Sequence, residues 1–168
     1  MTRPELDAVD RITSQWRAVR PDLDTSPISV IGRVSRLSRF VDRELAINFA
    51  RHGIEAWMYD VLATLRRSGE PYELSAGDLV RQSMVTTGAI TNRIDRLEQR
   101  GLVERAGADD RRKVIVRLTQ PGMDLVEEVV GTHLEAERDI LSSLSLRQRR
   151  ELAALLRVSL IALGDRAD

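Results

Sequence analysis

Threonine and asparagine side chains that can bind a nucleic acid gather around residues 86–92. Thr86 and Thr87 stand at the start of a segment with helical periodicity, and Thr91 and Asn92 follow one turn later. Hydroxyl and amide groups of these types hydrogen-bond to base edges and to phosphate oxygens. The apolar residues of the segment recur on another face, so the polar group is predicted to point away from the body of the domain.

A group of charged residues follows about twenty positions later. Arg111 and Arg112 stand directly after Asp109 and Asp110. An arginine at the tip of a hairpin can enter the minor groove of DNA, where the potential is most negative. A neighbouring carboxylate can hold the guanidinium in place through paired hydrogen bonds. A run of charges is more often a solvated loop, so the surrounding elements have to decide between the two interpretations.

The segment 74–122 places these side chains on a predicted winged helix-turn-helix. Ser75 can cap a short helix that ends near Arg81, and Thr86 or Thr87 can cap a second helix that stops before Gly101. Alternating strands are predicted over 102–105 and 113–118, with the arginine-rich tip between them. This order of elements favours binding of duplex DNA over a solvated loop on an ordinary helical domain.

Amphipathic helices flank this unit on both sides. Apolar spacing predicts helices over 5–19, 28–49 and 55–67, then a long helix from about residue 120 and a last one that begins at Ser145. The fold class is therefore mainly α with a small β-hairpin wing. We expect three regions: an N-terminal helical region (1–53), the winged helix-turn-helix (54–119) and C-terminal helices (120–168), the outer two forming a dimerisation layer.

The composition narrows the class of function. The chain of 168 residues has no cysteine, and His52 and His133 are its only imidazoles, so neither a thiol sensor nor a catalytic or metal site is expected. No nucleophile with a paired histidine and no phosphate-binding loop is present, so neither an enzyme nor a cofactor is expected. The lack of a long apolar run predicts a cytoplasmic protein without a membrane partner.

Charge is distributed unevenly along a chain whose formal net charge is zero. Between residues 81 and 117, nine Lys or Arg face five Asp or Glu, so the remainder of the chain is acidic. A basic patch on a neutral protein indicates a localised DNA surface rather than general adhesion to polyanions.

The segment 74–122 closely resembles the MarR family of bacterial transcriptional regulators. The resemblance is carried by RIDRLEQRGLVER at 93–105, DDRR at 109–112 and VRLTQPG at 116–122, and with the flanking helices it covers most of the chain. It implies a homodimer that binds a pseudo-palindromic operator in double-stranded DNA, usually as a repressor that a small ligand releases. By that resemblance residues 86–92 lie in the major groove, and Arg112 is the wing arginine with Asp110 as its partner.

A narrower resemblance points to the urate-responsive, PecS-like subgroup of that family. It rests on the extra N-terminal helix, on QWRAVRPDLDTSPISVIGRVSRL at 15–37 and on YDVLATLRRSGEP at 59–71. The subgroup holds an anionic ligand with a tryptophan, an aspartate and two arginines. The matching positions here are Trp16, Asp60, Arg93 and Arg105, so urate is the first choice of ligand, and an aconitate or another organic anion is the alternative.

Physical chemistry makes this set of four plausible and also offers simpler roles. Arg93 follows Ile90 and precedes Leu97 by helical spacings, which places it at the edge of the inward face, where a guanidinium needs an anionic partner. Trp16 could instead be simple packing, Asp60 a structural ion-pair partner, and Arg105 a phosphate contact. A protein that binds DNA with little sequence preference is the alternative function.

Replacing the wing arginine tests the DNA-binding interpretation. We expect Arg112→Ala to weaken binding to every duplex while the protein stays folded and dimeric, because a minor-groove cation is lost. Electrophoretic mobility shifts and size-exclusion chromatography measure the two properties. Unchanged affinity for DNA would remove the wing from the account.

Overall fold

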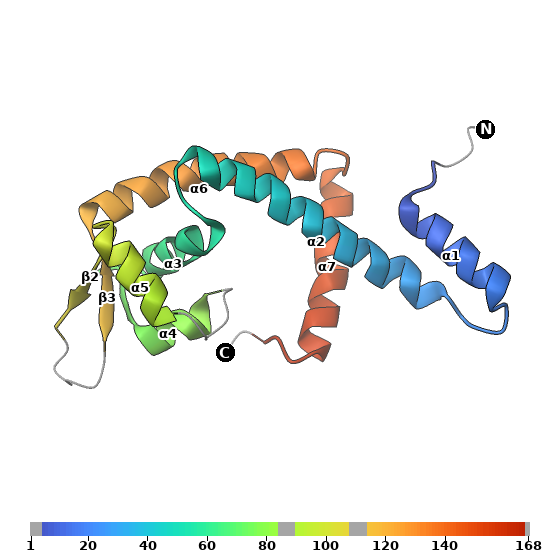
Figure 1. The fold of residues 1–168 in the computed structure, drawn as a ribbon, viewed down its shortest axis with the longest axis horizontal. Helices are drawn as coiled ribbons and strands as arrows, with labels where there is room; N and C mark the ends of the chain where they lie inside the picture. The colour runs from blue at the N-terminus through green and yellow to red at the C-terminus, as the bar shows by residue number, and fades with distance from the viewer. Residues whose placement is uncertain (1–4, 84–89, 108–113, 167–168) are drawn as a thin grey trace. The chain divides into compact units, whose positions relative to one another are not determined.

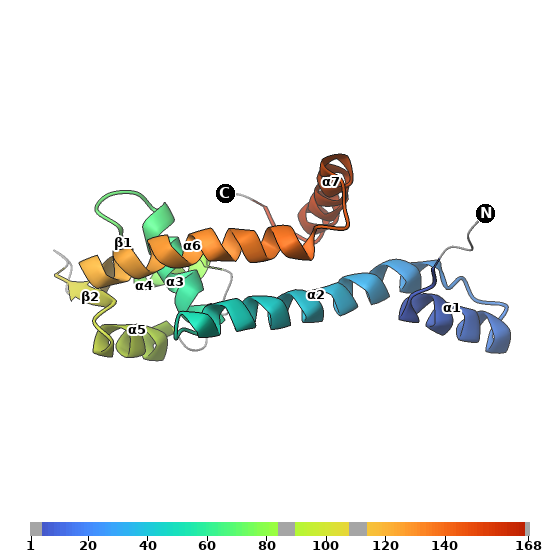
Figure 2. The same cartoon turned by 90° about the horizontal axis from the view of Figure 1, so that it is seen from above.

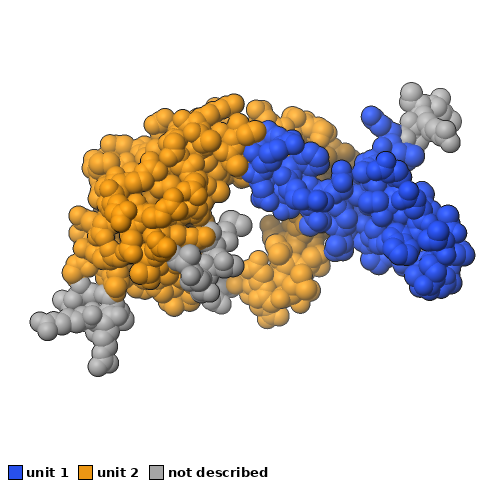
Figure 3. Space-filling view, in the orientation of Figure 1, with its two compact units in different colours: residues 1–44 blue, residues 45–168 orange. Residues whose placement is uncertain are grey.

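The computed structural model describes residues 5–83, 90–107 and 114–166, which form helices and one small sheet (Figure 1). The chain divides into two compact units, residues 1–44 and 45–168, coloured separately in Figure 3. Helix α2 (Ser26–Arg51) contributes residues to both units. The predicted fold class, a mainly helical winged helix-turn-helix, is confirmed, whereas the predicted region boundaries at 53 and 119 stay predictions.

The first unit contains α1 (Ala8–Val19) and most of α2. Asp7 caps α1 and forms a reciprocal capping box with Asp10, which is why the helix begins later than predicted. Arg33 of α2 ties both acids down, with Nε 2.8 Å from Asp7 and Nη2 2.7 Å from Asp10. Val9 is buried against Gly32, where a Cβ atom would lie only 3.2 Å from a Val9 methyl group. These contacts fix α1 on the N-terminal half of α2.

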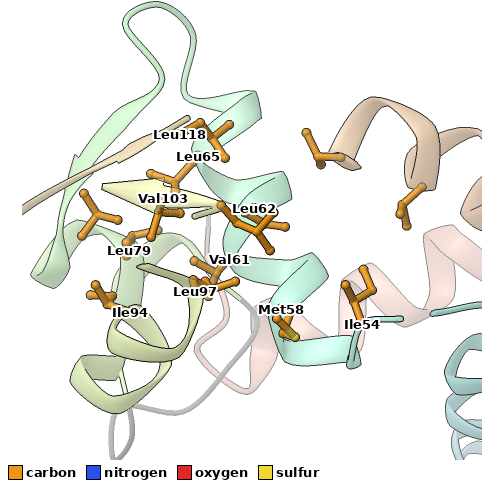
Figure 4. Packing of buried hydrophobic residues seen from close by; sticks show 14 of the residues in the cluster. Ile54, Met58, Val61, Leu62, Leu65, Leu79, Ile94, Leu97, Val103 and Leu118 are labelled. Atoms are coloured by element: carbon orange, nitrogen blue, oxygen red, sulfur yellow. The ribbon is translucent and has the colours of Figure 1, made fainter. Parts of the chain in front are cut away.

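The core of the second unit is built around α3 (Ala56–Arg67). Val61, Leu62 and Leu65 of this helix have no exposed surface, and Figure 4 shows them between the strands and the surrounding helices. Burial of such side chains supplies about 2 kcal/mol each. The other buried apolar residues of the cluster are Phe49, Ile54, Met58, Leu79, Ile94, Leu97, Leu102, Val103, Val116, Leu118, Val126 and Val129.

Three antiparallel strands form the sheet, in the order β1-β3-β2. They are β1 (Glu73–Ser75), β2 (Val103–Ala106) and β3 (Ile115–Leu118). Arg117 of the central strand stands opposite Glu73 on one side and Glu104 on the other. Its Nε is 2.7 Å from Glu73, and its Nη1 is 3.8 Å from Glu104. The hairpin predicted as a wing is thus joined to β1 by a second strand pairing, β1 with β3, and by the ion pair of Arg117 with Glu73.

The helix-turn-helix consists of α4 (Ala76–Gln82) and α5 (Ile90–Gln99). The side chain of Ser75 caps α4 as predicted, accepting a hydrogen bond of 3.1 Å from the backbone of Asp78. Gly101 follows α5 with a φ of 67°, a conformation that residues with a Cβ rarely adopt. The predicted stop of the second helix is therefore confirmed, and it lets the chain turn directly into β2.

The chain ends in two helices, α6 (Gln120–Ile140) and α7 (Leu146–Ala162). Thr119 caps α6, and Ser145, where the last helix is predicted to begin, forms a capping box with Gln148 at the start of α7. Helix α6 packs on α3, while α7 leaves the end of α6 at a steep angle (Figure 2). In the described chain α7 has no buried residue, and most of its large apolar side chains are exposed.

Two glycines of α6 provide a matched test of this packing. A Cβ atom at Gly122 would lie 1.9 Å from the carbonyl oxygen of Leu102, whereas one at Gly131 would meet nothing within 4 Å. We expect Gly122→Ala to lower the free energy of unfolding by about 3 kcal/mol or more, because backbone has to move. Gly131→Ala should raise it by up to about 1 kcal/mol.

Urea denaturation at one fixed protein concentration measures both variants. Equal stabilities for the two alanine variants would contradict the close approach of α6 to the start of β2.

Candidate nucleic-acid interface and anion site

Helix α5 buries one face and exposes the polar residues that the sequence singled out. Ile94 and Leu97 are fully buried against the core, while Thr91 and Asn92 are exposed on the first turn. This orientation is what contact with base edges requires, because such side chains have to extend into the groove. Contact of Thr91 and Asn92 with DNA stays a prediction.

The other predicted DNA-contacting residues lie outside the described residues. They are Thr86 and Thr87 before α5, and Asp110, Arg111 and Arg112 between β2 and β3. Their assigned roles therefore rest on the sequence alone.

Arg93 lies at the edge of the inward face of α5, where the helical spacing predicted it. It is half-buried, and its Cζ atom lies 5.6 Å from the centre of the Trp57 ring on α3. Its Nη1 nitrogen is buried and has no hydrogen-bond partner among the described residues. A guanidinium nitrogen in this state is unfavourable, so an incoming acceptor would be bound strongly there.

Trp57 is the main functional candidate that the sequence analysis missed. In the structure it is half-buried and also faces Arg96, whose Cζ atom is 4.8 Å from the ring centre. Arg96 in turn pairs with Glu55 at 2.6 Å. Aromatic faces attract cations, and guanidinium groups most often. In the sequence, the one sign of this contact was a tryptophan near the start of the helix predicted over 55–67, which comes before a segment rich in arginine.

Glu55, directly before α3, contacts Arg96 of α5. Hydrogen bonds from Trp57 and then from Arg96 hold the pKa of the Glu55 carboxyl below its usual range, so it stays ionised at neutral pH. The Glu55 carboxylate therefore holds one of the two guanidinium groups that face the Trp57 ring. This arrangement joins the beginning of α3 to the middle of α5.

Arg105, the second predicted ligand arginine, binds two carboxylates of α5. Its guanidinium pairs with Asp95 and Glu98, and its backbone N–H donates to Glu98 at 3.3 Å. The hydrogen bond to Asp95, followed by the charge of Glu98, raises the pKa of Arg105. These partners lie on α5, whereas Asp60 lies on α3. The structure therefore shows Arg105 as a tie between β2 and α5, a role that the sequence analysis did not predict.

The remaining two predicted ligand residues belong to different units. Asp60 is half-buried one turn after Trp57, and its carbonyl accepts a hydrogen bond of 2.7 Å from Thr64. Trp16 lies on α1 in the first unit, where 46% of its surface is exposed. The shared role of Trp16, Asp60, Arg93 and Arg105 in holding a ligand stays a prediction.

Both histidines contact side chains where α2 meets α6 in the second unit. His52 lies 3.1 Å from Glu128 and 2.9 Å from Thr132. The ring of His133 packs 4.7 Å from that of Tyr59, whose pKa is raised mainly by burial. Within the described ranges no three side chains of metal-ligating type come together, and none of the helices there is long and apolar enough to cross a bilayer.

Comparisons with known proteins agree on one family. A model described as "MarR family" matches residues 52–113. The chain is 45% identical over 149 residues to the HTH-type transcriptional regulator PecS of Dickeya dadantii (strain 3937), covering 88% of this chain and 90% of PecS.

Solved structures give the same result. A mutant of MarR from E. coli, complexed with operator DNA, has a TM-score of 0.72 at 25% identity, covering 81% of this chain and 96% of that one. BpsR of Bordetella bronchiseptica, described as regulated in DNA binding by 6-hydroxynicotinic acid, has a TM-score of 0.71 at 26% identity, covering 82% of this chain and 94% of that one.

Replacing Arg105 tests whether its ion pairs with Asp95 and Glu98 position β2 against α5 for binding DNA. We expect Arg105→Gln to lower the free energy of unfolding by about 1 kcal/mol or less, because these ion pairs are partly exposed. Affinity for duplex DNA should fall about tenfold, because β2 loses the ion pairs that position it against the helix carrying Thr91 and Asn92. Arg138→Gln, which removes the same charge from a pair of exposed residues on α6, is the control.

Chemical denaturation and fluorescence anisotropy with labelled DNA measure the two quantities. An Arg105→Gln protein that loses no more DNA affinity than Arg138→Gln would contradict the positioning role.

Proposed function

Since the chain belongs to the MarR family of DNA-binding transcriptional regulators, and is not an enzyme, we propose that it is a homodimeric repressor which an organic anion releases from its operator. The observation that carries the proposal is the state of Arg93. Its Nη1 is buried without a hydrogen-bond partner in the described residues, two positions from Thr91 and one from Asn92. An anion bound to Arg93 would therefore act on the helix that presents the DNA-contacting side chains.

The proposed DNA surface combines the first turn of α5 with the wing. Thr91 and Asn92 would read base edges in the major groove together with Thr86 and Thr87, and Arg111 and Arg112 would enter the minor groove with Asp110 as support. The E. coli MarR structure named above contains operator DNA, which supports this mode of binding.

Unpartnered apolar surface supports the homodimer. Seven large apolar residues on or next to α7 are at least 40% exposed: Leu146, Leu155, Leu156, Val158, Leu160, Ile161 and Leu163. Covering them would be worth about 25 cal/mol for each Å² removed from water, and a second copy of the chain offers the same apolar surface in return. A two-fold symmetric dimer accounts for a pseudo-palindromic operator with two half-sites.

The proposed effector is a planar anion, with urate as the first choice. Arg93 would bind its negative edge, and Asp60 would accept hydrogen bonds from its ring N–H groups. Arg105, which already pairs with two acids, would have to exchange one of them for the anion. The regulation of BpsR by 6-hydroxynicotinic acid supports this class of small aromatic acid, and an aconitate is the alternative.

Fluorescence anisotropy at fixed salt tests the proposal directly. We expect the protein to bind the intergenic DNA beside its own gene about a thousandfold more tightly than random duplex. Urate should weaken that binding between about fivefold and 150-fold, the usual range of coupling between two sites. Arg93→Gln should lose the response to urate.

The other outcomes are equally informative. Equal affinity for random duplex would contradict the repressor and favour a DNA-binding protein without sequence preference. Tight operator binding that ignores urate, but responds to another organic acid, would reject urate and keep the regulator.

A further inference from the structure

Two arginines of α5 share one aromatic ring of α3. The Cζ atoms of Arg93 and Arg96 lie 5.6 Å and 4.8 Å from the centre of the Trp57 ring. All three residues belong to the second unit, and the two arginines are separated by one helical turn. The ring is therefore a contact between α3 and α5 that depends on cation–π attraction as well as on packing.

The two arginines differ in what else holds them. Arg96 also pairs with Glu55 at 2.6 Å, so this guanidinium is held by the ring and by an acid. Arg93 has the ring but no carboxylate within ion-pair distance in the described part of the chain, and its Nη1 is buried without an acceptor. An anion would therefore attract Arg93 in preference to Arg96.

The C-terminal half of α5 is fixed by a further contact. Arg100, just after the helix, donates a hydrogen bond of 3.0 Å to the carbonyl of Gly53 and lies 3.4 Å from the sulfur of Met58. Together with Arg96 it holds this end of the helix to the start of α3. In the first turn of α5, which carries Thr91 and Asn92, Arg93 is the one described residue that faces Trp57.

We propose that the ring of Trp57 is the resting position of Arg93 in the DNA-binding state. An organic anion draws Arg93 off the ring while Arg96 and Arg100 keep their contacts, so the first turn of α5 shifts and its C-terminal end stays. This proposal rests on the anion-released regulator described above and assigns to Trp57 the role of a positioning residue. The ring competes with the anion for the same guanidinium, so it sets the affinity for the anion as well as for DNA.

Competition of this kind makes a reciprocal prediction for a variant without the ring. In Trp57→Leu, Arg93 has no resting position, so affinity for the operator should fall about fivefold while affinity for urate should rise about fivefold. Trp57→Phe keeps an aromatic face and should lie between the wild type and Trp57→Leu in both properties. Anisotropy measures operator binding, and isothermal calorimetry measures urate binding to the full-length dimer.

Arg96→Gln is the matched control, because it removes the other cation from the same ring. It should weaken operator binding without tightening the binding of urate. The melting temperature of each variant separates these effects from loss of the fold, and the Trp57→Phe protein keeps the test valid if Trp57→Leu does not fold.

The indole N–H of Trp57 gives a direct readout in the wild-type protein. The chain has two tryptophans, so a ¹⁵N–¹H spectrum contains two indole resonances, and Trp57→Phe assigns one of them. Saturating urate should shift the Trp57 resonance, and the resonance in Arg93→Gln should not respond.

The outcomes separate this proposal from the function on which it rests. If urate binds and releases the operator, but the Trp57 resonance stays in place and Trp57→Leu binds urate with unchanged affinity, the resting position is wrong and the regulator stands. If urate binds none of the proteins, both the proposed effector and the resting position are rejected.

Discussion

The packing of α5 against α3 determines what the protein can present to DNA. Ile94 and Leu97 bury one face of α5 in the same core as Val61 and Leu62 (Figure 4). This leaves Thr91 and Asn92 at the surface. The apolar contacts fix which face points inward, but they do not fix a small movement along or about the helix axis. Arg93 and Arg96, at the edge of that face, restrict this movement through their contacts with Trp57.

Charged side chains tie together the elements that surround α5. Arg105 links β2 to Asp95 and Glu98, and Arg117 links the three strands through Glu73 and Glu104. Each of these pairs is partly exposed and contributes little to stability alone. These ion pairs matter for the arrangement of the elements, because they connect the strands of the sheet with one another and with α5 in the second unit. Arg93 differs from them in having an aromatic ring where the others have an acid.

Local signals in the sequence were sufficient to predict the elements, whereas contacts between distant residues were not predictable. Ser75 and Ser145 were identified as caps because capping depends on residues three positions apart. The association of Trp57 with Arg93 joins residues on different helices, and no spacing along the chain reveals it. Arg105 was correctly placed at the end of a strand, but its acid partners depend on how β2 folds back along α5.

The central claim is that one guanidinium cannot serve an organic anion and the DNA-binding arrangement of α5 at the same time. Calorimetric titration of urate into the free protein and into the protein saturated with operator DNA tests this claim most directly. Linkage requires urate to bind the operator complex more weakly, by the same factor by which urate weakens operator binding. Equal affinity of urate for the free and the DNA-bound protein would contradict the account.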